Sequence, residues 1–255
     1  MSVNVRRVAV MRGWDWVIEG ALIFSKSAMM WVSLLAALFV ASRLLLLIPL
    51  IGVVLALITP NFIAGLAHGA RAVEQGKPLR FGYLASGFLR SGATLVAIGG
   101  LSLAGQILIV LLMVQIGGDA FADISGAMMG GGAPPDDATQ ETMRAAAPSV
   151  VLAVLVGFVL LILLMMMTGF ASLLAFFDGV GPLSAFALGL RACFKNLLPF
   201  LLYGVMLLTP ILALMPLTVA VHQPDLGLWL MSPLLLPSLY ASYKDVFAPA
   251  PAAAD

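Results

Sequence analysis

The chain has 255 residues, of which 62% are hydrophobic and 10% charged, and its mean hydropathy is +1.10. Soluble domains are about half apolar and about a quarter charged, so this composition excludes an ordinary soluble protein and predicts an integral membrane protein. The 13 basic and 12 acidic residues nearly cancel, which leaves no electrostatic argument for nucleic acid as a partner.

The first predicted element is a short amphipathic helix within residues 1–27. Asp15 and Glu19 lie on one face, and the opposite face carries apolar residues at helical spacing: Trp14, Val17, Ile18 and Ala21. Tryptophan is suited to the headgroup level, so we expect this helix to lie in the membrane interface. The apolar run that follows, 28–47, is about 20 residues long and matches a hydrocarbon core of about 30 Å.

Five further apolar runs predict five more spans. Short amphipathic segments precede the third span, at 81–90, and the fifth span, at 182–195. The stretch 117–147 is rich in glycine, proline and acidic residues and predicts a flexible external loop, whereas the Pro/Ala-rich end, 248–255, predicts a disordered tail. We therefore expect residues 1–247 to form one all-α membrane domain with six transmembrane helices: about 28–47, 53–73, 91–116, 149–177, 196–220 and 226–243.

The distribution of basic residues predicts the orientation of these spans. When the loops are assigned to alternate sides, every Lys and Arg except Arg43 and Arg144 falls on one side. By the positive-inside rule, that side and both termini are cytoplasmic, and the acidic loop is external.

An internal repeat is indicated by a shift of the chain that places Glu74 on Asp178. The same shift places Pro78 on Pro182, and each proline suits the first turn of a short helix. We expect each carboxylate to lie near the N-terminal dipole of that helix. A looser third copy precedes the first span, which predicts three units of an entry segment plus a helical hairpin. The alternative is chance similarity among apolar segments.

Three motifs stand out along the chain: RAVE at 71–74 with GKP at 76–78, ACFKN at 192–196 with YG at 203–204, and YASYKDVF at 240–247. In these motifs the chain resembles a family of uncharacterised six-span proteobacterial inner-membrane proteins, related more distantly to the membrane domain of glycerophosphodiester phosphodiesterases. The resemblance implies an inner-membrane localisation and a six-span architecture, and it supplies no catalytic residues. The structural candidates are Glu74, Pro78, Asp178, Pro182, Asn196, Tyr243 and Asp245.

The sequence contains no recognisable catalytic or metal-binding motif. It lacks a zinc-protease, nucleophile-elbow or P-loop pattern. One cysteine cannot form a disulfide within the chain, and two histidines cannot by themselves form a zinc site. We expect a non-enzymatic multi-pass membrane protein without cofactor or metal, with membrane lipids and either a membrane protein or a second copy as partners.

A small transporter or a lipid-handling protein is the alternative function, and an intramembrane enzyme is a third. Prolines interrupt several predicted spans, and irregular backbone inside a membrane is tolerated where it lines a cavity. The polar residues near these prolines are the candidate cavity residues: Asn61, Thr209, Ser232 and Tyr240. The spans lack a central acid or base for ion coupling, which argues against the transporter.

Overall fold

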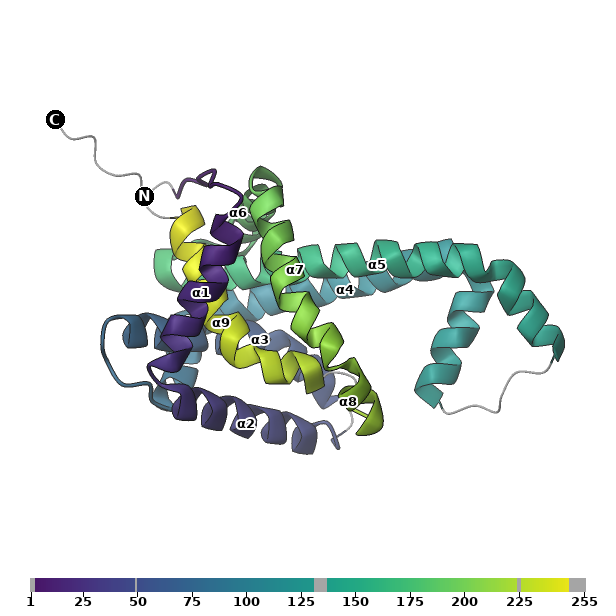
Figure 1. The fold of residues 1–255 in the computed structure, drawn as a ribbon, viewed down its shortest axis with the longest axis horizontal. Helices are drawn as coiled ribbons and strands as arrows, with labels where there is room; N and C mark the ends of the chain where they lie inside the picture. Colours follow the sequence, from purple (N-terminus) through teal and green to yellow (C-terminus); the bar gives the residue numbers. More distant parts are fainter. Residues whose placement is uncertain (1–2, 49, 131–136, 224–225, 248–255) are drawn as a thin grey trace. The chain divides into compact units, whose positions relative to one another are not determined.

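The computed structural model describes residues 3–48, 50–130, 137–223 and 226–247, and this part of the chain is helical without a strand (Figure 1). The predicted all-α class is confirmed. The helices in chain order are α1 (Arg12–Ser25), α2 (Ala28–Leu45), α3 (Ile51–Glu74), α4 (Gly82–Gly130), α5 (Asp137–Asp178), α6 (Pro182–Lys195), α7 (Leu197–Ala213), α8 (Met215–Ala220) and α9 (Leu226–Phe247).

Four helical stretches are long and apolar enough to cross a membrane: Ala28–Leu45, Ile51–Glu74, Gly82–Phe121 and Ala146–Asp178. The helices α6 and α7 meet the same test as a pair, but the chain bends by 89° between them, so the described residues contain four or five candidate spans. This finding supports a membrane protein, whereas the sequence predicted six spans. The difference lies at the C-terminal end, where α7 has only 17 residues and α9, although continuous, contains Pro233, Pro237 and the polar residues of its last turns.

Two predicted connections are helical in the structure. The segment 81–90 is not a separate entry helix, because α4 begins at Gly82 and continues through it into the apolar run. The predicted loop 117–147 is helical over 117–130 and 137–147, while 131–136 and the predicted tail 248–255 lie outside the described residues. Extending an existing helix needs no new nucleus, and Ala, Met, Gln, Glu and Arg in this stretch are good helix formers.

The chain divides into two compact units, Leu101–Met166 and the remainder. Within Leu101–Met166, α4 and α5 pack through glycines. A Cβ atom on Gly157 would lie 2.2 Å from Sδ of Met113, and one on Gly105 would lie 2.9 Å from the Leu164 side chain. Small residues at these points allow the two long helices to approach closely, as is common among membrane helices.

In the larger unit, which holds both ends of the chain, α9 packs against α1, α2, α3 and α7 (Figure 1). An aromatic cluster fills the space between these helices and α5. The ring of Trp16 lies 5.1 Å from that of Phe200, and Phe170 lies 5.4 Å from both Phe200 and Phe247. Trp16 and Phe170 are fully buried, so this cluster is the centre of the unit's core.

The helix α1 has a packed face that differs from the apolar face predicted by the sequence. Gly13 lies against the backbone of α7, and Gly20 lies against Ser238 of α9, so close that an added Cβ would fall 2.2 Å from the carbonyl oxygen of Pro199 and 2.6 Å from Cβ of Ser238. The predicted apolar face is instead outward, with Trp14 and Ile18 each 43% exposed. Thus α1 is held between other helices on one side and presents apolar side chains on another.

Candidate functional site

The last two turns of α9 carry the polar residues of the 240–247 motif, and they bind the ends of two other helices. The hydroxyl of Tyr240 donates a hydrogen bond of 2.9 Å to Oε2 of Glu74, the last residue of α3. The hydroxyl of Tyr243 donates to Oδ2 of Asp178, the last residue of α5. Lys244 forms an ion pair with the other carboxylate oxygen of Glu74. The C-terminal helix therefore holds α3 and α5 by their final residues.

The two carboxylates of the predicted repeat thus share a position and a kind of partner. A negative charge at a helix C-terminus is unfavourable beside the carbonyl end of the helix dipole, so a hydroxyl donor or a cation stabilises it there. The contacts that the structure places on Glu74 and Asp178 come from α9, whereas the sequence predicted the dipole of the following helix.

The paired prolines differ in the structure. Pro182 is the first residue of α6, as predicted, because its missing N–H costs nothing at that position. Pro78 lies in the connection between α3 and α4 and is outside any helix, since α4 begins only at Gly82. The prediction that Pro78 opens a short helix is wrong.

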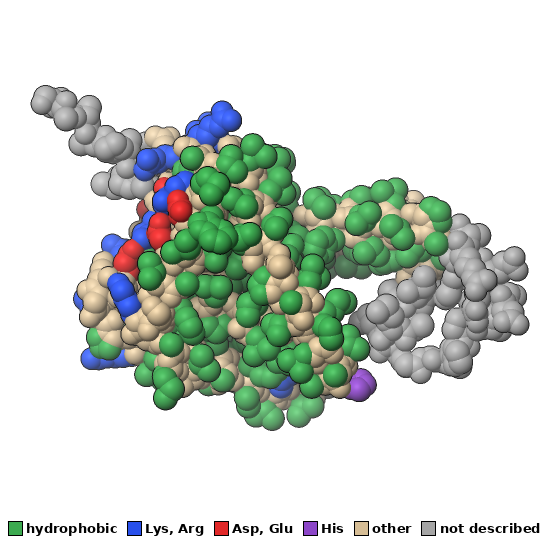
Figure 2. Space-filling view, viewed as in Figure 1, with side chains coloured by type: hydrophobic (Ala, Val, Ile, Leu, Met, Phe, Trp, Pro, Cys, Tyr) green, Lys and Arg blue, Asp and Glu red, His purple; other side chains and the backbone are tan. Residues whose placement is uncertain are grey.

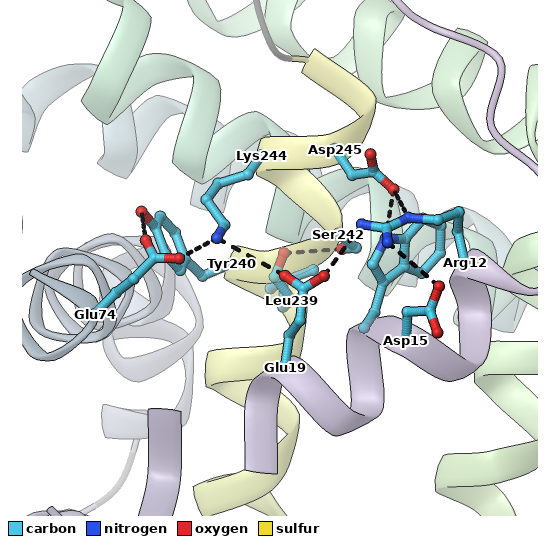
Figure 3. A network of polar contacts seen from close by, with 10 residues as sticks. Arg12, Asp15, Glu19, Glu74, Leu239, Tyr240, Ser242, Lys244 and Asp245 are labelled. Atoms are coloured by element: carbon cyan, nitrogen blue, oxygen red, sulfur yellow. Dashed lines mark hydrogen bonds and ion pairs between the residues drawn. The ribbon is translucent and has the colours of Figure 1, made fainter. Parts of the chain in front are cut away.

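A second group of polar contacts joins α1 to the same end of α9 (Figure 3). The guanidinium of Arg12 donates from Nε to Oδ2 of Asp245 over 2.6 Å, and the indole N–H of Trp16 donates to the same oxygen over 3.0 Å. Arg12 also pairs with Asp15 at 3.2 Å and with Glu19 at 3.1 Å. The hydrogen bond to Asp245 raises the pKa of Arg12 above its ordinary value, so this guanidinium stays charged.

These contacts form one row of alternating charge across three helices, as Figure 3 shows. Lys244 links the two parts of the row, because its ammonium lies 3.8 Å from Glu19 in addition to its pair with Glu74. The side chains are 18–43% exposed, so each pair alone contributes little free energy, and the arrangement depends on their connection into a network. We call this set, with Tyr240 and Trp16, the α9 network.

The segment ahead of α1 is tied to the bend between α6 and α7. Asn196, which is buried at this bend, accepts a hydrogen bond from the backbone N–H of Val8 and donates one to the carbonyl of Arg6, over 2.9 and 2.8 Å. Lys195 donates to the carbonyl of Val5 over 2.6 Å. A buried amide with both ends bonded specifies one position for the segment, so Asn196 acts as a clamp.

The structure does not gather the four candidate cavity residues into one place. Tyr240 belongs to the α9 network, and Thr209 is an exposed residue of α7 whose hydroxyl donates to the carbonyl of Val205. The hydroxyl of Ser232 likewise donates to Trp229 in its own helix. Asn61 is fully buried, and neither polar atom of its amide has a hydrogen-bond partner within the described part of the chain.

The sequence predicted three residues of the α9 network: Glu74 and Asp245 as structural candidates, and Tyr240 as a cavity candidate. It missed the other five as site residues: Arg12, Asp15, Trp16, Glu19 and Lys244. The helical spacing of Arg12, Trp16 and Glu19 is a local signal, since these positions fall near one face of a helix. The partner of Arg12 and Trp16 is Asp245, more than 200 residues away. No local pattern points to that pairing.

Within the described residues, no group of three or more His, Cys, Asp and Glu side chains is placed to hold a metal ion. Comparison with family models, curated proteins and solved structures found no match to this chain. The family resemblance described above therefore stays a prediction.

Proposed function

We propose that the chain is a non-catalytic, six-span protein of the bacterial inner membrane, with both termini in the cytoplasm, and that it provides a rigid cytoplasmic platform for a lipid or protein partner. The observation that best supports this proposal is that the carboxylates in and beside the α9 network form bonds between helices. Glu74, Asp178 and Asp245 each meet a donor or a cation from another helix. A general base needs a lone pair directed at substrate, whereas these carboxylates are used to join helices.

The α9 network also favours the proposed threefold organisation. The first two proposed units supply charged residues to the 240–247 motif of the third: Arg12 and Glu74 come from the first unit, and Asp178 comes from the end of the second. Gly76 and Gly179, which follow these two carboxylates, both have positive φ, of 79° and 67°. Helices α3 and α5 thus both end at a glycine in the left-handed region, although Gly76 lies two residues after Glu74 and Gly179 only one residue after Asp178.

The fifth and sixth spans are proposed to be α7 with α8, and α9. Asn196 turns the chain by 89° from α6 into α7, which is the geometry of a surface helix leading into a span. The proposed orientation is supported by the basic residues, which the sequence places almost entirely on one side of the spans. In Figure 2 most of the charged side chains in view lie along one side, while hydrophobic side chains cover most of the rest of that face.

The test of the proposed role compares how far each variant loses stability with how far it loses function in the cell. Asp245→Asn and Tyr240→Phe remove partners from the α9 network, and Tyr203→Phe is a matched control that removes a buried hydroxyl bonded to Ser238 over 2.8 Å. Membrane abundance, thermal unfolding in detergent and complementation of a deletion strain are measured for each. We expect complementation to fall only as far as abundance and stability fall, for the network variants and the control alike. Lost complementation at full abundance and stability would refute the non-catalytic role.

Asn61 favours a second candidate function, the handling of a lipid or small polar molecule within the membrane. A buried polar group without a hydrogen bond costs about 1–3 kcal/mol, and Asn61 follows Pro60, which removes a backbone donor from the middle of α3. Mass spectrometry of molecules that copurify with the wild type and with Asn61→Leu tests this function. A compound held by the wild type and absent from the variant would support it.

A further inference from the structure

Four exposed basic residues near the end of α3 and the start of α4 have no carboxylate partner among the described side chains: Arg71, Lys77, Arg80 and Arg90. The nearest acidic residue in sequence, Glu74, is paired with Lys244 and Tyr240, and Asp178 is bonded to Tyr243. Both carboxylates are therefore bonded to α9, and neither forms a described ion pair with Arg71, Lys77 or Arg90. We call Arg71, Lys77 and Arg90 the cationic cluster.

Aromatic rings at the end of α5 hold two members of this cluster. The guanidinium carbon of Arg71 lies 5.4 Å from the ring centre of Phe177, and that of Arg90 lies 5.1 Å from the ring centre of Phe176. The two rings are themselves 5.1 Å apart. Cation–π contacts of this kind restrict the guanidinium groups while leaving their N–H donors available.

The third member is placed by the turn that ends α3. Gly76 has a φ of 79°, and the N–H of Lys77 bonds to the carbonyl of Ala72 over 2.9 Å, which are the features of a Schellman turn. His68, three residues before Arg71 in α3, has its ring 5.3 Å from that of Phe176. Arg71 and Arg90 thus lie beside neighbouring rings at the end of α5, and Lys77 follows the turn that ends α3.

Apolar side chains are exposed beside the cluster. Phe81 is 50% exposed, and Leu89, next to Arg90, is 86% exposed. The cluster also lies at the ends of three candidate spans, because α3 ends, α4 begins and α5 ends there. A molecule bound at this place would meet both positive charge and exposed apolar side chains.

We infer that the cationic cluster binds the headgroup phosphate of an anionic phospholipid, with the acyl chains lying against the exposed apolar residues of α4. Guanidinium groups match phosphate oxygens in geometry and charge, and basic pockets between membrane helices on the cytoplasmic side bind anionic lipid headgroups. A bound anion removes the mutual repulsion of the three cations. The adjoining apolar residues favour a lipid over free phosphate. This inference rests on the proposed cytoplasmic position of the end of α3, and it does not depend on the absence of catalysis.

Native mass spectrometry of the purified full-length protein in neutral detergent tests the site, with phosphatidylglycerol and phosphatidylcholine added separately. Each basic residue near a membrane surface is worth about fivefold in affinity for an anionic lipid. We expect Arg71→Gln with Arg90→Gln to weaken retention of phosphatidylglycerol about 25-fold, and Lys77→Gln about fivefold. Lys77 lies outside the helices, so its variant tests the site even if the double variant is unstable.

The matched control is Arg6→Gln with Arg7→Gln, which removes the same charge from two exposed residues ahead of α1 and is expected to leave retention unchanged. Equal retention of the two lipids by the wild type would overturn the inference. So would equal losses in the control and the double variant, or unchanged retention in Lys77→Gln. Inorganic phosphate, compared with chloride at the same ionic strength, is expected not to displace the lipid; selective displacement by phosphate would assign the site to the free anion.

Discussion

A close contact in the larger unit, at Gly13, allows a sharp test of how α1 is held. Gly13→Ala would place a Cβ 2.2 Å from the carbonyl oxygen of Pro199, whereas ordinary contact begins at 3.4 Å. The carbonyl oxygen of Pro199 belongs to the backbone of α7 and cannot rotate away from the new Cβ. The helices α1 and α7 must therefore separate by about 1 Å at this point. That movement loosens the packing of Trp16 on Phe200 and stretches the adjoining hydrogen bonds of Arg12 and Trp16 to Asp245.

The expected magnitude is set by two opposing terms. Overpacking costs about 1–3 kcal/mol, and alanine in place of a helical glycine returns about 0.5–1 kcal/mol. Taking the middle of each range, we expect Gly13→Ala to lower the free energy of unfolding by about 1 kcal/mol. Gly204→Ala is the control, because Gly204 is also helical but has open space around its Cβ position, and that variant is expected to be slightly more stable than the wild type.

Cys193 provides the assay, since it is the single cysteine and its side chain is buried in α6. A thiol-reactive fluorophore in detergent reacts as the fold opens, so its fluorescence follows thermal unfolding. The melting temperature should fall for Gly13→Ala and rise slightly for Gly204→Ala. If Gly13→Ala melted at or above the wild-type temperature, the close packing of α1 on α7 would be refuted.

Three further predictions concern the α9 network, the buried amide and the topology. Glu74→Gln and Asp178→Asn should each lower the free energy of unfolding by about 1 kcal/mol, because each weakens a charge-assisted hydrogen bond to a tyrosine of α9. Thermal unfolding measures both losses, and strongly unequal losses would contradict the equivalence of the two carboxylates. Asn61→Leu should raise the unfolding temperature, because it removes an unbonded buried amide, and a lower temperature would show that the amide is satisfied. Alkaline phosphatase fused after Gly131, which lies outside the described residues, should be active, and fused after Lys77 inactive; the reverse pattern would overturn the orientation.

Some features of this protein follow from the sequence because their causes are local. Long apolar runs and the scarcity of charge determine a helical membrane protein, since an isolated segment in lipid must satisfy its own backbone hydrogen bonds. Pro182 begins a helix because its own ring favours the first turn, whatever packs nearby. The same local reasoning was wrong for Pro78, where composition alone did not show that α4 begins at Gly82.

Only the tertiary structure decided which polar groups meet. Tyr240, Tyr243 and Asp245 fall within one short motif, yet their partners lie in α3, α5 and α1. Hydrophobic periodicity reports which side of a helix faces apolar surroundings, and it carries no information on which distant residue lies opposite. The packed face of α1 shows this most clearly. Gly13 and Gly20 are small enough for α7 and α9 to approach, and that role exists only once those helices are in place.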